Sequence, residues 1–180
     1  SAHLVVVTST LSAFSTGTDS TGIYLRSSAL TVDTVSVSVT ELKADATTDG
    51  VTDASQSDLT TGNNGNIILL AGGALVLNDG TDVTGASSED NTDGKAVSAN
   101  GSGHILIDSI TNSLTVNADI VSTTGHITLK AVSTISINAG VNVTTGTPGT
   151  VSLDAETRTP TMDADAVVRA TDSRRRLAAS

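Results

Sequence analysis

The segment Gly-His-Ile-Leu at residues 103–106 returns as Gly-His-Ile-Thr at residues 125–128, 22 positions further on. Each copy opens a wider frame, Gly-x-apolar-x-apolar-x-(Ala or Ser), which reads GNIILLA at 65–71, GHILIDS at 103–109, GHITLKA at 125–131 and GTVSLDA at 149–155. Internal repetition with a period of about 20–50 residues is typical of solenoids, propellers and arrays. The fold must therefore place these segments in equivalent positions.

Each repeat contains two further alternating segments. The second reads LVLN at 75–78, LTVN at 114–117 and ISIN at 135–138, with LTVD at 30–33 and TMD at 161–163 as weaker versions. The third is marked by Ile120, Val121, Val141, Val143, Val167 and Val168. Alternation with period two is typical of strands with one buried face. Three short strands in every 22–24 residues predict an all-β fold, a parallel β-solenoid (β-helix) whose turns stack about 4.8 Å apart.

Stacked turns bring equivalent residues into columns. The second apolar position of the frame predicts one internal core column, formed by Leu69, Ile107, Leu129 and Leu153. The second segment predicts two more, Leu75 with Leu114 and Ile135, and Leu77 with Val116 and Ile137. We expect a single domain over 1–180 with roughly seven turns, clearest over 65–155, faint over 1–64 and irregular over 156–180.

Polar residues also repeat once per turn. The end of the second strand carries Asp33, Asn78, Asn117, Asn138 and Asp163. Because an Asn side chain both donates and accepts hydrogen bonds, stacked Asn residues can bond to one another, and we expect a structural ladder here. The glycines that begin the frame, Gly65, Gly103, Gly125 and Gly149, are expected to supply a positive φ at one corner.

Two polar, acidic segments interrupt the repeat, at 40–64 and 84–102, and we expect both to be surface loops. The first segment contains Asp45, Asp49, Asp53 and Asp58. The candidate calcium ligands lie just before or within the second segment and are Asp79, Asp82, Glu89, Asp90 and Asp93. Calcium takes about six to eight oxygen ligands. Neither an EF-hand loop nor a Gly-Gly-x-Gly-x-Asp repeat is complete. Solvated acidic loops are therefore the main interpretation and weak calcium binding the alternative, with no other cofactor expected.

His104 and His126 lie one period apart, where other turns carry Asn66 and Thr150. Two imidazoles stacked about 4.8 Å apart could share a metal ion. No third and fourth ligands follow at a compatible spacing, and the neighbours in the column vary. An outward-facing, solvated position is therefore the preferred interpretation of both histidines.

The composition excludes several function classes. The net charge of −10 argues against binding to nucleic acid. No stretch approaches the roughly 18 apolar residues of a membrane span, and the opening SAHLVVVTSTL lacks the basic start of a signal peptide. A glycan-degrading enzyme would need paired carboxylates and aromatic platforms. Phe14 and Tyr24 are the only aromatic residues other than histidine, so we expect no enzyme.

The stretch from GHILIDSITNSLTVNADIV to GTVSLDA, residues 103–155, resembles the tandem β-helical repeats of giant bacterial surface and secreted proteins of the filamentous-haemagglutinin and autotransporter-adhesin kind. The similarity extends over 65–155 and loosely over the flanks. It implies an extracellular or cell-surface location and a stalk-like or fibrous role. DSRRRLAAS at 172–180 departs from the pattern, because three arginines stand where a strand should begin.

The chain begins in the strand-like HLVVV and stops inside a recognisable turn, which predicts either a segment of a longer array or a subunit whose ends stack on neighbours. The leading expectation is an extracellular structural protein that assembles end to end with copies of itself or with neighbouring repeats of a longer chain. The candidate assembly contacts are Val5, Val7, Arg174, Arg175, Arg176 and Leu177. The alternative is the stalk or binding module of an adhesin, which contacts a receptor or glycan through residues 40–64 and 84–102.

Overall fold

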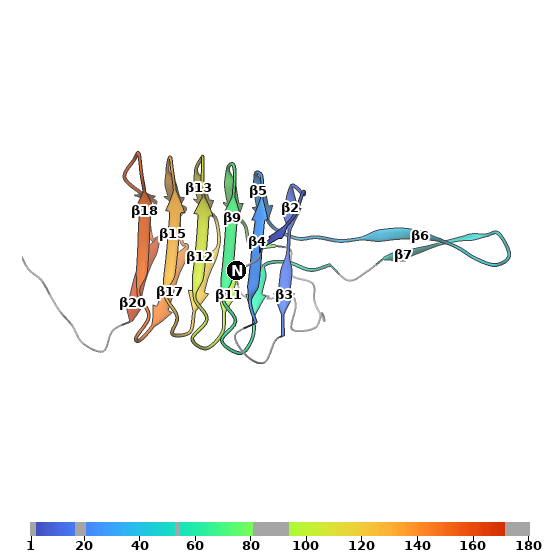
Figure 1. Ribbon diagram of the computed structural model, residues 1–180, viewed down its shortest axis with the longest axis horizontal. Coiled ribbons are helices and arrows are strands. Elements are labelled where there is room, and N and C mark those ends of the chain that lie inside the picture. Colours follow the sequence, from blue (N-terminus) through green and yellow to red (C-terminus); the bar gives the residue numbers. More distant parts are fainter. Residues whose placement is uncertain (1–2, 17–20, 53–54, 81–93, 172–180) are drawn as a thin grey trace, which may run out of the picture.

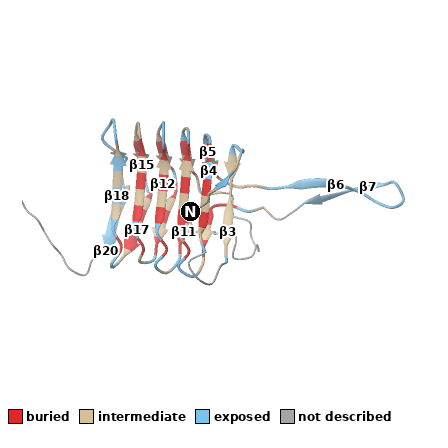
Figure 2. Cartoon of the chain, viewed as in Figure 1, coloured by how far each residue is buried: buried red, intermediate tan, exposed pale blue. Residues whose placement is uncertain are grey.

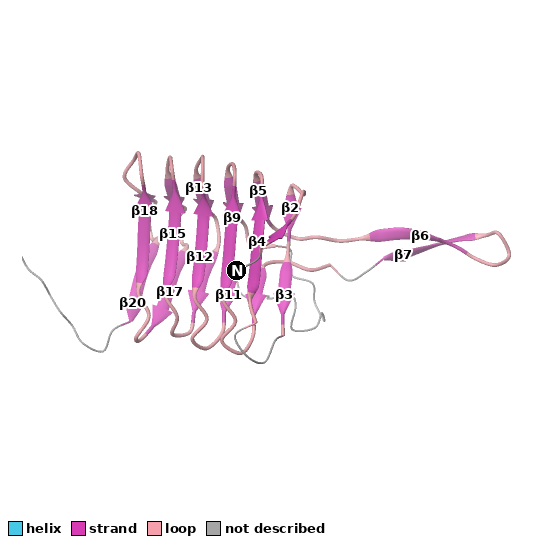
Figure 3. Ribbon diagram, viewed as in Figure 1, coloured by secondary structure: helices cyan, strands magenta, loops and turns pink. Residues whose placement is uncertain are grey.

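The computed structural model describes residues 3–16, 21–52, 55–80 and 94–171. These residues form strands β1 to β20, and no helix that could cross a membrane occurs among them. Three parallel sheets contain six strands each, and the remaining two strands form a separate antiparallel hairpin (Figure 3). The predicted all-β parallel solenoid with three strands per turn is confirmed.

Each sheet collects one strand from every turn. Sheet A contains β1 (Leu4–Val5), β4 (Ile23–Ser27), β9 (Ile67–Ala71), β12 (Ile105–Ser109), β15 (Ile127–Ala131) and β18 (Val151–Ala155). Sheet B contains β2 (Thr10–Leu11), β5 (Leu30–Val32), β10 (Leu75–Leu77), β13 (Leu114–Val116), β16 (Ile135–Ile137) and β19 (Thr161–Met162). Sheet C contains β3 (Ala13–Ser15), β8 (Leu59–Thr61), β11 (Lys95–Ala99), β14 (Asp119–Ser122), β17 (Asn142–Gly146) and β20 (Val167–Thr171).

The turns lie side by side along the long axis of the molecule, with the strands running across it (Figure 1). Six strands per sheet correspond to six stacked turns in the described residues, close to the roughly seven expected. The seventh turn was expected around Leu177, which lies outside the described residues.

The strand register brings the repeated aliphatic residues into the predicted core columns. Leu69, Ile107 and Leu129 occupy consecutive positions in sheet A and are fully buried, whereas Leu153 at the end of the stack is half-buried. The columns of sheet B are equally regular, with Leu75 opposite Leu114 and Leu114 opposite Ile135. Burial is therefore concentrated in the middle turns and declines toward both ends of the stack (Figure 2).

Both interruptions of the repeat leave the solenoid at the same corner, between a strand of sheet B and the following strand of sheet C. The first contains the hairpin of β6 (Ser38–Leu42) and β7 (Thr48–Thr52). Its expected bounds, 40–64, were too wide because 59–61 form β8, and 84–102 was too wide because 95–99 form β11. Leu59 and Val97 face each other and are fully buried, so these two strands complete the core of their turns.

The expectation of a positive φ at the repeated glycines was wrong. Among the described glycines, φ is positive at Gly94, Gly101 and Gly140. A Cβ on Gly125 would instead collide with the carbonyl oxygen of Gly103 in the turn before it, and Gly149 has the same relation to Gly125. The repeated glycine is therefore required because successive backbones approach closely at the corner between sheets C and A.

Buried hydroxyl groups support that corner. The hydroxyl of Thr61 donates a hydrogen bond to the carbonyl oxygen of Gly65 (2.7 Å), that of Ser122 to Gly103 (2.8 Å) and that of Thr145 to Gly125 (2.6 Å). Thr61 and Ser122 end their strands of sheet C, Thr145 is the next-to-last residue of β17, and all three are buried. These side chains satisfy carbonyl groups that the tight corner would otherwise leave without a partner.

The expected ladder at the end of sheet B is present over four of its five members. The Nδ2 group of Asn78 donates to Asp33 Oδ2 (2.8 Å), Asn117 Nδ2 to Asn78 Oδ1 (2.7 Å) and Asn138 Nδ2 to Asn117 Oδ1 (2.5 Å). Every amide therefore donates toward the N-terminal end of the stack, and the Asp33 carboxylate is the final acceptor. The Nδ2 group of Asn138 donates to Asn117, which leaves Asn138 Oδ1 and the Asp163 carboxylate, both acceptors. Among the described residues no hydrogen bond joins these two side chains, because neither oxygen supplies a donor.

Candidate functional site

His104 and His126 face solvent from the segments that lead into β12 and β15. Their rings are stacked, with centroids 5.0 Å apart and planes inclined by 4°. The backbone N–H of His126 donates to Nδ1 of His104 (2.9 Å), and the N–H of Thr150 donates to Nδ1 of His126 (3.1 Å). In the preceding turn Asn66 Oδ1 accepts from the N–H of His104 in the same way (2.8 Å). The imidazoles thus extend an outer ladder along sheet A.

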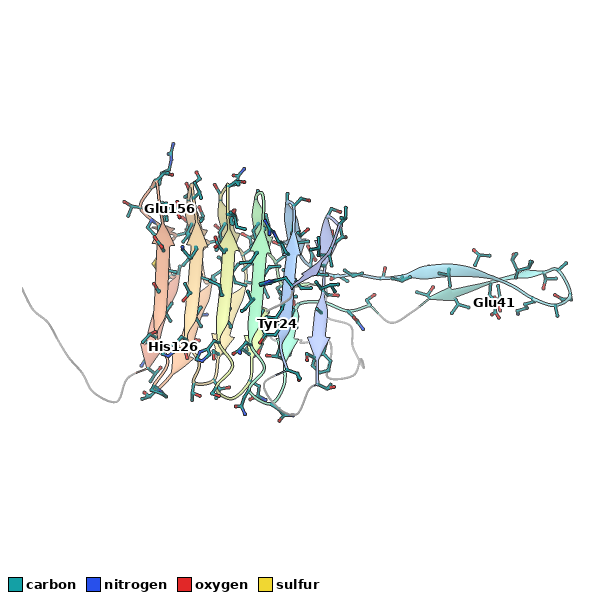
Figure 4. All side chains as sticks on the ribbon, in the orientation of Figure 1. Tyr24, Glu41, His126 and Glu156 are labelled. Atoms are coloured by element: carbon teal, nitrogen blue, oxygen red, sulfur yellow. The ribbon has the colours of Figure 1, made fainter. Side chains whose placement is uncertain are left out.

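This geometry favours a structural role for the two histidines over a metal site. Each Nδ1 accepts a hydrogen bond from the next turn, so that nitrogen is not free to bind a metal ion. No group of three or more His, Cys, Asp or Glu side chains that could hold a metal occurs among the described residues. Tyr24 lies on the same sheet (Figure 4), and its hydroxyl is 3.5 Å from Nδ2 of Asn66.

A surface pocket of about 300 Å³ lies beside this ladder. Its walls are mostly apolar, and its lining residues are Asn66, Ile68, His104, Ile105, Leu106, His126 and Thr128. The described lining contains no carboxylate that could pair with an imidazole as an acid–base couple.

The structure does not bring the described acidic candidates together. Asp45 accepts hydrogen bonds from the hydroxyl and the N–H of Thr47 in the hairpin turn, which lower the pKa of its carboxyl. Asp49 pairs with Lys43 at 2.7 Å. Asp79 is exposed on the solenoid, and the other calcium candidates, Asp82, Glu89, Asp90 and Asp93, lie outside the described residues, as does Asp53.

Asp58 contradicts the expectation of a solvated acidic loop. Its side chain is 1% exposed, and φ at this residue is 68°. The hydroxyl of Ser57 donates to Asp58 Oδ2 (3.0 Å), and the N–H of Gly80 donates to Oδ1 (3.3 Å). Gly80 follows β10, the sheet B strand of the next turn. The Asp58 carboxylate therefore connects the end of the first interruption to the start of the second. Asp58 is therefore a structural residue at the sheet B to sheet C corner.

Charged side chains form an outward column on sheet A. The register stacks Asp108 on Lys130 and Lys130 on Asp154, with Leu70 and Arg26 in the two preceding turns. Lys130 Nζ lies 3.6 Å from Asp154 Oδ2. Burial raises the pKa of the Asp108 carboxyl, Lys130 offsets part of this effect, and Glu156 and Asp154 add to it. The ionised form of Asp108 is therefore less favourable in the folded chain than in the unfolded one.

Replacing Asp108 by Asn should stabilise the protein at neutral pH. Because the folded-state pKa of Asp108 is raised, the carboxyl costs nothing below its ordinary value of 3.8 and weakens the fold as pH rises through the folded-state value. Urea unfolding at pH 7 should show a gain of a few tenths to about 1 kcal/mol in D108N. The two proteins should converge as the pH is lowered toward 3.8.

Asp154→Asn on the neighbouring strand is the matched control for this prediction, because its carboxylate is more exposed and pairs with Lys130. Its effect at pH 7 should stay within about 0.5 kcal/mol. A loss of stability in D108N at pH 7 would show that attraction to Lys130 outweighs the cost of burial.

The β6–β7 hairpin is the most exposed described part of the chain. It pairs with no sheet of the solenoid and projects along the long axis beyond β3, as Figure 1 shows. Val39 and Val51 face each other across the hairpin and are 56% and 47% exposed. Glu41, labelled in Figure 4, stands directly opposite Asp49. An isolated two-stranded hairpin is marginally stable in water.

Both ends of the solenoid present apolar side chains. At one end Leu4 and Val5 of β1 are 65% and 68% exposed, and at the other Met162 of β19 is 45% exposed. Val7 is also exposed, but it lies beyond the end of β1. The remaining candidate contacts, Arg174, Arg175, Arg176 and Leu177, lie outside the described residues. In the described residues, β1, β2 and β3 at one end and β18, β19 and β20 at the other each pair with a strand on one side only.

Comparison with known proteins gives no match to a family model, to a curated protein or to a solved structure.

Proposed function

We propose that the chain is an extracellular structural protein, a β-solenoid unit of a filament or surface fibre that assembles end to end. The observation that carries the proposal is the chemistry of the two ends. The inward columns of all three sheets finish in apolar side chains on outermost strands, Leu4, Leu11 and Ala13 at one end and Leu153, Met162 and Val168 at the other. Outermost strands also offer N–H and C=O groups for pairing with another chain.

The interior supports a structural role. Stability comes from aliphatic columns and repeated hydrogen-bond ladders rather than from one cluster of chemically active groups. We assign the chain no catalytic step. The partners are copies of the chain or neighbouring repeats of a longer one. An acidic, Cys-free composition rich in Thr and Asn, together with the resemblance to filamentous-haemagglutinin and autotransporter-adhesin repeats, supports a location outside a bacterial cell.

Leu4→Lys tests end-to-end assembly. Leu4 is already largely exposed in the single copy, so a lysine there costs the fold little but places a charge in an apolar joint. Sedimentation and electron microscopy should show filaments for the unmodified chain and isolated short rods for L4K. Thr115→Lys, on the outer side of the middle strand β13, adds the same charge away from the ends and should leave filaments intact. Isolated rods of the unmodified chain at high concentration would refute the proposal.

A second candidate function is the stalk or binding module of an adhesin that contacts a receptor or glycan. The exposed valines of the projecting hairpin favour it, because this element is built away from the solenoid core. Replacing residues 38–52 by a Gly-Gly connection should then abolish attachment to target cells while filaments still form. Attachment that survives this deletion would remove the hairpin from the binding surface.

A further inference from the structure

The two ends of the solenoid match each other in strand position as well as in chemistry. Within the chain, each turn pairs in parallel with the next, and the inward residues stay in register from first turn to last. Applying the same register once more places Leu4 of a second copy on Leu153. It also places Leu11 on Met162 and Ala13 on Val168. All three sheets can therefore continue across a joint at once.

Charge distinguishes this arrangement from a joint between two C-terminal ends. The described residues of the last turn, 149–171, carry Asp154, Glu156, Asp163 and Asp165 against Arg158 and Arg169, whereas those of the first turn, 3–16, carry no Asp or Glu. Joining two C-terminal ends would bring the acidic groups of one turn against those of its copy, which is unfavourable. Joining unlike ends sets the acidic turn against one without acidic residues.

The polar ladder supplies a specific contact. The carboxylate of Asp163 is the last member of the column and has no hydrogen bond within the described residues. Ser12 is the residue after Leu11, and Asp163 is the residue after Met162. A joint that stacks Leu11 of a second copy on Met162 therefore also places the Ser12 hydroxyl of that copy against the Asp163 carboxylate. A hydroxyl donates where Asp163 can only accept. Ser12 would thus occupy the donor position that the Asn residues fill inside the chain.

Building on the proposed end-to-end assembly, we propose that the joint is head to tail and in register, with the β1–β3 end of one copy on the β18–β20 end of a second copy and the Ser12 hydroxyl donating to Asp163. The next strand of sheet A then lies about 4.8 Å away, as within the chain. Because every copy then points in the same direction, the two ends of the filament differ from each other as the two ends of a single copy do.

Cysteine pairs test the register sharply because the chain contains no cysteine. Val5 and Asp154 occupy the same outward column, so a mixture of Val5→Cys and Asp154→Cys proteins should form a mixed disulfide dimer under mild oxidation by glutathione disulfide. Val5→Cys mixed with Ser152→Cys is the control. Ser152 lies two residues away along β18, which moves the second Cα beyond the range of about 4.4–6.8 Å that a disulfide spans.

The possible outcomes distinguish a failure of the proposed register from a failure of the proposed function. A mixed dimer from the first pair, with little from the control, supports the proposed register. A dimer of Val5→Cys alone would indicate head-to-head contact, and one of Asp154→Cys alone tail-to-tail contact, and either would overturn the proposal. Filaments of the unmodified chain without a mixed dimer would refute the register but keep the proposed function. The absence of both filaments and cross-links would refute the proposed function itself.

The Ser12–Asp163 contact has its own test, an exchange of donor and acceptor. Ser12→Asp should shorten filaments severalfold, because two carboxylates then meet at the joint. Adding Asp163→Asn restores a donor and an acceptor and should restore the filament length. Circular dichroism and sedimentation of dilute protein check that each variant is folded. Unchanged filaments in S12D, or no recovery in the double variant, would remove this contact from the joint.

Discussion

Replacing Gly125 by alanine is expected to destabilise the protein by at least about 3 kcal/mol. The added Cβ would collide with the carbonyl oxygen of Gly103 and would lie 2.8 Å from the hydroxyl oxygen of Ser122. That hydroxyl also accepts a hydrogen bond from the N–H of Gly125 (2.8 Å), so the corner has no room to adjust. Urea unfolding followed by circular dichroism would measure the loss.

Gly50→Ala is the matched control for this prediction. Gly50 lies in β7, its φ is not in the left-handed region, and no atom lies within 4 Å of an added Cβ. Its effect should be within about 0.5 kcal/mol. If G125A unfolds at the same urea concentration as G50A, close approach between turns is not what requires glycine at this corner.

Replacing Ile107 by alanine is expected to cost about 2–5 kcal/mol, the usual range for deleting a fully buried aliphatic side chain. Ile107 lies between Leu69 and Leu129 and is completely buried. Each turn of a solenoid contacts only its neighbours, so a cavity in the fourth turn weakens the link between the N-terminal and C-terminal turns. Urea unfolding of I107A should therefore begin earlier and become broader or biphasic.

The neighbouring residue Leu106 provides the control because it points to the outer side of the same strand and is only half-buried. Leu106→Ala should cost clearly less than Ile107→Ala and keep a single transition. Equal losses in the two variants would mean that the inner column does not dominate the stability of this turn.

The repeat alone predicted the architecture, because stacking requires the same residue type at the same place in every turn. Leu69, Ile107 and Leu129 could be aligned from their spacing, and the structure stacks them in that register. The outward position of His104 and His126 was also predicted correctly, since their column contains unrelated side chains. Residues that occupy equivalent positions in successive turns could therefore be identified from the repeat.

Features without that repetition were missed. Strands β8 (LTT) and β11 (KAVSA) contain one and three apolar residues, and alanine accounts for two of the three in β11. Next to polar residues they were therefore assigned to the acidic loops. Burial of Asp58 depends on Ser57 and Gly80, which no spacing rule connects. The hydroxyls of Thr61, Ser122 and Thr145 do share a position, but the interruptions displace Thr61 from the regular period. A search for a hydroxyl three or four residues before each frame glycine would have found them.

The direction of the hydrogen bonds between turns has a mechanical consequence. They run along the long axis while the strands cross it, so tension applied between the two ends pulls these bonds apart rather than shearing them. A loaded molecule would then yield one turn at a time from whichever end is weaker. Each regular turn of 22–24 residues would release roughly 70–90 Å of extended chain. A fibre of the proposed kind would therefore lengthen in steps under force rather than break at once.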